Sequence, residues 1–147
     1  MNNSDFFHGA VLSKIIDNKF VRLGKYIRSN SSYIIDDKIV IYIKYSQKRI
    51  SPWTFSFSKV HAEELKKIKE DNQCLSIVLL CNDDGICCLN FQEFSTIISI
   101  ENENFPKWIK VQRQYGEKYA VSGSDGELKY KIGNSDFPQK IYERSGN

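Results

Sequence analysis

The sequence predicts a single α+β domain in which a mixed β-sheet is flanked by helices. Three apolar runs within residues 33–57 are separated by two polar breaks, which is typical of a three-stranded meander joined by tight turns. A nearly continuous apolar run, residues 75–81, has the composition of a central strand covered on both faces. Apolar residues at helical spacing before and after the meander predict helices that cover the sheet.

The strand prediction for residues 39–46 depends on a period of two. Isoleucines and a tyrosine occupy every second position, while the positions between them carry Val40, Tyr42, Lys44 and Ser46. Residues 53–57 alternate in the same way, with Trp53 and two phenylalanines on one face. Such alternation, rich in β-branched and aromatic residues, indicates half-buried strands.

Three helices are expected around these strands. The first covers residues 5–17, where Ser4 is a suitable N-cap and an apolar stripe recurs every three or four residues. The second covers residues 59–70 and begins after Ser58. The third is short and begins at Asn90, which opens a capping box.

Residues 5–100 therefore form the expected α/β core, with residues 20–23 as a short additional strand. Residues 107–147 are expected to form a β-rich extension of the same domain. A strand is predicted over residues 108–114, followed by a hairpin around the turn sequence at 123–126.

Composition is that of one globular domain. The chain has 147 residues, of which 41% are hydrophobic and 27% charged, and this length buries a core without disulfides. No apolar stretch approaches the ~20 residues of a membrane-spanning helix. The first five residues lack the basic and apolar regions of a signal peptide. We therefore expect a cytoplasmic protein with no membrane partner.

Four cysteines lie in or beside apolar strand sequence. If residues 84–85 form a two-residue turn, Cys81 and Cys88 face each other across a hairpin. Their spacing lacks the paired Cys-x2-Cys units of a structural zinc site. This favours buried reduced thiols, with a disulfide or a metal site as the alternatives.

Charge is distributed unevenly along the chain. Between residues 14 and 59, ten Lys and Arg against three Asp give a net charge of +7. Between residues 60 and 106, three Lys against nine Asp and Glu give −6. This asymmetry predicts a basic face built from the meander and an acidic face elsewhere. A basic face is compatible with nucleic acid.

One possible catalytic arrangement lies in the meander, where Asp36 and Asp37 end one strand and Lys44 lies in the next. With the αβββαβ order of residues 5–80, this arrangement resembles the core of the restriction-endonuclease-like, or PD-(D/E)xK, nuclease superfamily. The resemblance implies that Asp36 and Asp37 hold Mg²⁺, which activates a water molecule to attack a phosphodiester. Lys44 would help to orient that water.

The sequence departs from the family pattern two residues before Lys44. The family has a second acidic residue at this position, and this chain has Tyr42. A phenol is a poor ligand for Mg²⁺, which prefers carboxylates and water. Either another residue supplies the missing carboxylate, with Asp5 as the candidate, or the site only binds its ligand.

Cations interspersed with aromatic residues give indirect support for nucleic-acid binding. The alternative is that these aromatic residues belong to the core and the lysines maintain solubility. Cations contact phosphates, while exposed aromatic rings stack on unpaired bases. Trp53 and Tyr42 lie near the first cations, and Trp108, Tyr115, Tyr119 and Tyr130 alternate with the later ones. The predicted contacts are Lys44, Lys48, Arg49, Arg113, Lys129 and Lys131.

These observations predict a protein that binds or processes nucleic acid. The alternative is a non-enzymatic protein-interaction subunit of a larger intracellular assembly, which would use exposed aromatic residues and the acidic surface of residues 60–106. No Gly-rich phosphate-binding loop is present. The only two histidines, His8 and His61, lack the neighbours of a nucleophilic triad.

Overall fold

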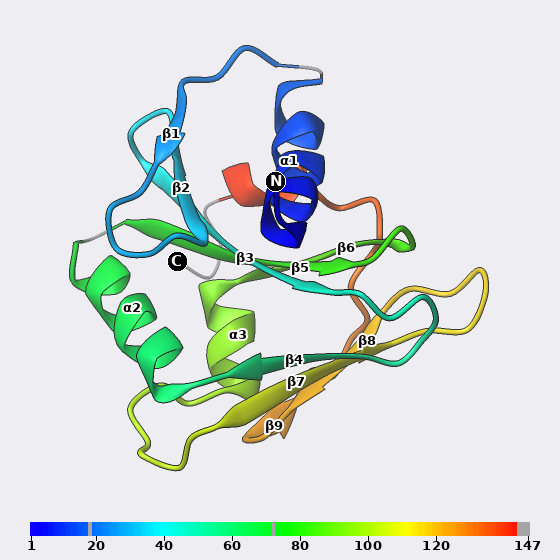
Figure 1. Ribbon diagram of the computed structural model, residues 1–147. Coiled ribbons are helices and arrows are strands. Elements are labelled where there is room, and N and C mark those ends of the chain that lie inside the picture. The colour runs from blue at the N-terminus through cyan, green and yellow to red at the C-terminus, as the bar shows by residue number, and fades with distance from the viewer. Residues whose placement is uncertain (18, 72, 144–147) are drawn as a thin grey trace.

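The computed structural model describes residues 1–17, 19–71 and 73–143. It confirms a single-domain α+β fold containing a mixed β-sheet. Figure 1 shows that this sheet lies between helix α1 on one side and helices α2 and α3, with a second sheet, on the other. The elements are α1 (Asn3–Ile16), β1 (Leu23–Lys25), β2 (Ser32–Ile35), β3 (Ile39–Ser46), β4 (Trp53–Phe57), α2 (Lys59–Glu70), β5 (Cys74–Cys81), β6 (Gly85–Asn90), α3 (Phe91–Ile97), β7 (Lys107–Gln112), β8 (Ala120–Gly123), β9 (Gly126–Glu127) and the 3-10 helix η1 (Gln139–Tyr142).

Sheet A has the strand order β1-β2-β3-β5-β6. Strands β3 and β5 are parallel, and the other neighbours are antiparallel. The predicted first strand at residues 20–23 is displaced, since β1 begins at Leu23. Strand β5 is buried along Leu75–Cys81, as its continuous apolar sequence predicted.

The predicted three-stranded meander is right for β2 and β3 and wrong for β4. Strand β4 leaves sheet A and pairs with β7 in sheet B, which has the order β4-β7-β8-β9. The alternation of Trp53 and its neighbours showed which side chains are buried but not which strand is the partner. The six residues between β3 and β4 exceed a tight turn and allow the chain to cross to the second layer.

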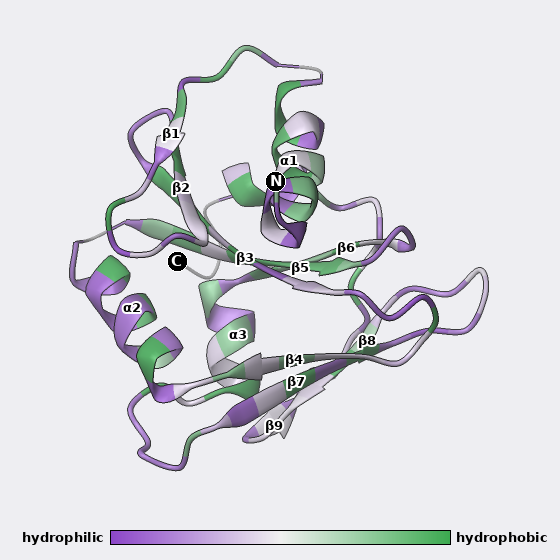
Figure 2. Ribbon diagram, in the orientation of Figure 1, coloured by the Kyte–Doolittle hydropathy of each residue, from purple (hydrophilic) through white to green (hydrophobic). Residues whose placement is uncertain are grey.

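The two faces of sheet A pack against different layers. Ile39, Ile41 and Ile43 of β3 lie in one core with residues of α1 and η1. Val40 and Tyr42 lie in the other core, beneath α2, α3 and sheet B. Figure 2 shows hydrophobic colour along β5 and β6 and hydrophilic colour over much of α2. Both faces of β3 are therefore buried over residues 39–43, so the prediction of a half-buried strand is wrong there, because a second layer covers the face that alternation assigned to solvent.

The predicted helices are present, with one correction at an N-terminus. Ser58 and Asn90 cap α2 and α3 as expected. Helix α1 is instead capped by Asn2, whose side chain accepts from the Asp5 amide at 3.0 Å. In return, the Asp5 carboxylate accepts a hydrogen bond from the Asn2 amide at 3.0 Å. This reciprocal capping box places the N-cap at Asn2, two residues before the predicted cap, Ser4.

The cysteines occupy a different register from the predicted one. Cys81 pairs with Gly85, and Cys88 pairs with Val78, so the two thiols do not face each other across the hairpin. The turn spans Asn82–Asp84, because Gly85 already belongs to β6. Burial raises the pKa values of Cys81 and Cys88 to about 12, which keeps both thiols protonated near neutral pH.

The segment after residue 106 completes the second core. Ile109, Val111 and Tyr119 pack in the same cluster as Trp53 of β4. Strands β8 and β9 form the expected hairpin, and a single bridge between Tyr119 and Ile132 extends it. Within the described residues, no helix has the length and apolar composition needed to cross a membrane.

Candidate nucleic-acid interface

Asp36 and Asp37, the predicted metal ligands, form the turn between β2 and β3. Both adopt left-handed backbone conformations, with φ values of 53° and 58°, which aspartate tolerates in turns. The Asp36 carboxylate accepts from the Arg22 amide at 2.8 Å, and Asp37 pairs with the Arg22 guanidinium. Both carboxylates therefore fasten the turn to the segment before β1.

Lys44 lies toward the other end of β3. It lies five positions after Ile39, the first residue of the strand, which corresponds to about 17 Å of extended chain. The structure therefore does not bring Lys44 together with Asp36 and Asp37. Among the described residues, no group of three or more His, Cys, Asp or Glu side chains has the arrangement to hold a metal ion.

The Lys44 amine instead lies beside helix α2. Its Nζ atom is 3.5 Å from Nδ1 of His61 and 5.0 Å from the centre of the Phe57 ring. Burial lowers the pKa of Lys44, and the nearby Glu64 carboxylate opposes this effect. Burial, together with Lys44, also lowers the pKa of His61. Burial therefore makes the charged form of each side chain less favourable than it is in water.

Glu64 is the carboxylate that the sequence analysis did not identify. The Tyr42 hydroxyl donates to Glu64 Oε1 at 2.6 Å, and burial raises the pKa of Tyr42. An acidic residue on α2 thus contacts Tyr42 of β3. No local sequence signal places Glu64 beside Tyr42, because this contact depends on how α2 lies against β3.

Arg113 has a structural partner rather than a free guanidinium. It donates to both oxygens of Asp84, at 2.8 and 2.7 Å, and Tyr119 donates to the same carboxylate at 2.7 Å. These hydrogen bonds lower the pKa of Asp84 and raise that of Arg113. Lys131 forms a more exposed ion pair with Glu117, with 3.2 Å between Nζ and Oε2.

The other predicted cations, Lys48, Arg49 and Lys129, are exposed. In the described part of the chain, no carboxylate lies within 4.0 Å of any of the three. The Lys48 carbonyl accepts from the indole nitrogen of Trp53 at 2.8 Å, which fixes the β3–β4 loop at the end of sheet B.

The predicted aromatic residues divide into two groups. Tyr42, Trp53 and Tyr119 are buried in the core and cannot stack on a ligand. Trp108, Tyr115 and Tyr130 have exposed rings, and of these three only Trp108 lies in a strand, as the second residue of β7.

Trp108 belongs to the solvent-facing side of sheet B, which we term the outer face. Ile109 and Val111 point to the core, so Trp108, Lys110 and Gln112 point outward. On either side of β7 the outward residues are short, because Ser56 is opposite Trp108, while Thr54 and Ser122 flank Lys110. The sequence already indicated this shared face, because Trp108 and Lys110 are two positions apart in an alternating segment.

The outer face continues into two loops at one end of sheet B. Figure 1 shows the β3–β4 and β7–β8 loops together at this end, and the Arg113 amide donates to Ser51 Oγ at 3.0 Å between them. Ser51, Gln112 and Lys131 contribute to a hollow of about 330 Å³ there. The exposed cations Lys48 and Arg49 lie on the first loop.

Comparison of the chain with protein-family models, curated proteins and solved structures finds no match.

Proposed function

We propose that this protein binds single-stranded nucleic acid across the outer face of sheet B and does not cleave it. The observation that carries the proposal is the position of Trp108, which is 43% exposed on an antiparallel sheet with Lys110 two residues away on the same face. An exposed ring beside a cation provides a stacking surface and a phosphate contact together.

The residues around Trp108 leave its ring accessible to a base. Ser56 and Thr54 on β4 carry side chains too short to cover an indole. Ser122 on β8 is equally short. Stacking of a base on an aromatic side chain contributes about 1–3 kcal/mol and tolerates any base, because every base has a π-face.

Cations at the loop end extend this surface. Lys48 and Arg49 have no carboxylate within 4.0 Å among the described residues, so both charges are available to phosphates. We assign Lys110, Lys48 and Arg49 as the phosphate contacts. Lys129 is a further candidate, Lys131 is already paired with Glu117, and Arg113 supports the loop through Asp84.

The positions of the predicted catalytic residues support the proposal of binding without cleavage. Asp36 and Asp37 are engaged by Arg22, and Lys44 lies beside α2. A metal-dependent hydrolysis needs carboxylates that converge on the ion and the attacking water. We expect no Mg²⁺-dependent cleavage of labelled DNA or RNA, and cleavage abolished by Lys44→Ala would contradict this.

The binding test is fluorescence anisotropy with labelled single- and double-stranded oligonucleotides over a range of salt concentrations. Three phosphate contacts predict that the logarithm of the association constant falls by about 2 for each tenfold increase in salt. Trp53 is buried, so intrinsic fluorescence changes on binding should come from Trp108. Single strands should bind more tightly, because their bases are free to stack.

Matched variants test whether binding depends on the outer face or only on the positive charge of the whole protein. Trp108→Ala should weaken single-strand binding by about 1–3 kcal/mol. Phe20→Ala removes an exposed ring far from sheet B and should leave binding unchanged. Likewise, Lys110→Gln should reduce the salt dependence, and Lys14→Gln on α1 should not. Failure of either strand form to bind would overturn the proposal and favour the protein-interaction alternative.

A further inference from the structure

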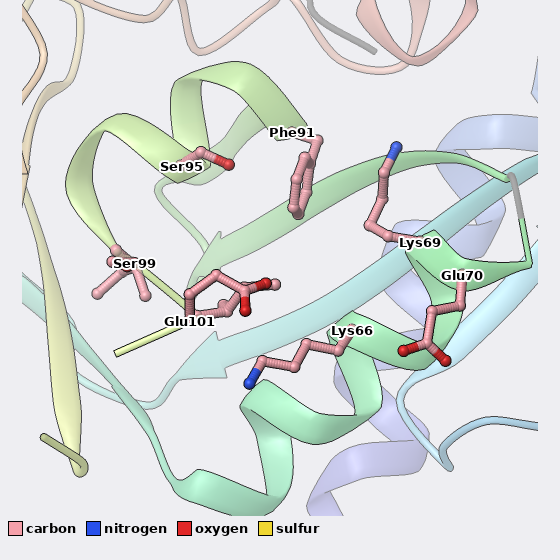
Figure 3. Close-up of a pocket in the computed structure, with 9 residues that line it drawn as sticks. Lys66, Lys69, Glu70, Phe91, Ser95, Ser99 and Glu101 are labelled. Atoms are coloured by element: carbon pink, nitrogen blue, oxygen red, sulfur yellow. The ribbon is translucent and has the colours of Figure 1, made fainter. Parts of the chain in front are cut away.

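The outer face of sheet B differs in composition from the groove that separates helices α2 and α3. Figure 3 shows Lys66 and Lys69 in this groove together with Glu70 and Glu101, so its charges balance and favour neither an anion nor a cation. The outer face instead surrounds an exposed indole and an ammonium group with hydroxyl side chains. A hydroxyl group both donates and accepts hydrogen bonds, so this surface is suited to an uncharged polar part of a ligand.

Three hydroxyl side chains lie next to Trp108 and Lys110 in the strand register. Ser56 of β4 is directly opposite Trp108. Lys110 lies between Thr54 of β4 and Ser122 of β8. Thr54 and Ser56 are exposed and Ser122 is half-buried, and none of the three hydroxyl groups has a hydrogen-bond partner among the described residues. All three are therefore available to a ligand on this face.

The sugar of a bound nucleotide has a defined place on this surface, because it joins the base to the phosphate. With a base stacked on Trp108 and a phosphate at Lys110, the sugar lies over the part of β7 between them, which spans about 7 Å. Side chains directly opposite each other on one face of a sheet have Cβ atoms about 4.5–5.5 Å apart. The hydroxyl groups on the neighbouring strands are therefore within reach of the sugar.

A carboxylate limits the surface on the side of β9. Glu127 is opposite Ser122, on the side of β8 away from Lys110. It is exposed, and no cation lies within 4.0 Å of it in the described part of the chain. Its charge repels a phosphate, so the phosphate is expected on the side of Lys110 toward β4. This position brings the sugar beside Ser56 and Thr54.

Ribose and deoxyribose present different chemistry to these two side chains. The 2′-hydroxyl group of ribose donates and accepts hydrogen bonds, and it is the group by which a protein distinguishes RNA from DNA. The same carbon of deoxyribose carries only hydrogen and makes no such bond. A ribose thus bonds Ser56 and Thr54, whereas a deoxyribose leaves both hydroxyl groups to water.

We propose that the outer face of sheet B selects RNA over DNA through hydrogen bonds between the ribose 2′-hydroxyl group and the side chains of Ser56 and Thr54. This inference rests on the proposed binding of single-stranded nucleic acid at Trp108. One hydrogen bond between uncharged groups corresponds to about a fivefold difference in affinity. The preference does not depend on the base, because the contact is to the sugar.

The first test is fluorescence anisotropy with three labelled single strands of one sequence. They are RNA, the 2′-fluoro analogue of that RNA, and DNA with uracil in place of thymine. The 2′-fluoro sugar keeps a ribose-like shape and cannot donate a hydrogen bond, so it separates the hydroxyl group from the shape of the strand. RNA should bind at least about fivefold more tightly than either of the others.

The salt dependence and the pattern of failure distinguish this inference from the proposed function. The three strands carry the same charge, so their affinities should fall together as salt is raised, while the ratio between them stays constant. Equal affinity for RNA and its 2′-fluoro analogue would overturn this inference and leave the proposed function intact. Failure of all three strands to bind would overturn both.

The second test uses variants of the full chain. Ser56→Ala and Thr54→Val remove the two hydroxyl groups with little change in side-chain shape, and together they should bring the ratio of RNA affinity to DNA affinity close to one. Ser13→Ala removes an exposed hydroxyl group from α1, on the far side of sheet A (Figure 1), and should leave this ratio unchanged. An unchanged ratio in the double variant would show that other residues recognise the sugar and would overturn the proposal.

Discussion

Arg113 and Asp84 join the two sheets of the molecule through a pair of hydrogen bonds. Arg113 follows β7 in sheet B, and Asp84 lies in the turn between β5 and β6 of sheet A. Their side chains are only 15% and 21% exposed. The position and low exposure of this ion pair make it a structural clamp between the layers.

Replacing Arg113 should therefore destabilise the fold. We expect Arg113→Gln to lower the free energy of unfolding by about 1.5–3 kcal/mol, because a hydrogen-bonded, partly buried carboxylate loses its partner. Lys131→Gln removes an exposed ion pair and should cost less than about 0.5 kcal/mol. Urea denaturation measures both. Asp84→Asn completes a double-mutant cycle, and a coupling energy near zero would contradict the clamp.

Asp71 should make stability depend on pH in the acid range. Hydrogen bonds from Arg28 and then Tyr26 lower the pKa of Asp71 to about 2. In the unfolded chain this pKa is about 3.9. The unfolded state therefore binds the proton first, and the contribution of Asp71 is complete above pH 4 and lost as pH falls toward 2. Asp71→Asn should flatten this part of the stability profile measured by urea denaturation, and an unchanged profile would contradict the assignment.

Substitution by alanine at two glycines should change the stability of the protein in opposite directions. A Cβ atom at Gly9 would meet nothing within 4 Å, so Gly9→Ala in α1 should stabilise the protein by about 0.5–1 kcal/mol. A Cβ atom at Gly123 would lie 2.5 Å from the Ile97 carbonyl oxygen. Because that atom belongs to the backbone, Gly123→Ala should cost about 1–3 kcal/mol. Thermal unfolding distinguishes the two, and a destabilised Gly9→Ala variant would be inconsistent with an open helix face.

Lys107 should be costly to replace despite its charge. Its side chain is 2% exposed, and Nζ donates to the Ser99 carbonyl at 2.8 Å and to Asp125 at 2.5 Å. We expect Lys107→Met to lower the free energy of unfolding by about 3 kcal/mol, since Asp125 remains without its cation. Adding Asp125→Asn should restore part of this loss in denaturant titrations. A double variant less stable than the single one would show that the pair does not act through charge.

Sequence patterns predicted elements whose determinants are local. Strands β3 and β5 followed from the spacing and composition of their apolar residues, and Ser58 and Asn90 marked two helix starts. The pairing of β4 with β7 was not predictable in the same way, because alternation specifies a buried face and not a neighbour. The pairing joins residues far apart in the sequence, and it accompanies packing of Trp53 against Tyr119, whose ring centres are 6.0 Å apart.

The candidate sites were predictable to different extents. Trp108 and Lys110 are two positions apart in a predicted strand, so alternation places both side chains on the same face. The bond between Tyr42 and Glu64 joins residues 22 positions apart and depends on how α2 crosses β3. Burial of Tyr119 also required the tertiary structure, since its local sequence resembles that of the exposed Tyr115.

The crossing of β4 between the sheets affects the order in which the chain can fold. Trp53 pairs with Val111, so the register of β4 is completed only after more than fifty further residues have left the ribosome. Until then β4 presents an unpaired edge with three large aromatic side chains, which is a template for intermolecular pairing. Such non-local strand pairing slows folding relative to helical proteins of the same size. A nascent chain that ends before β7 should therefore be the species most prone to aggregate.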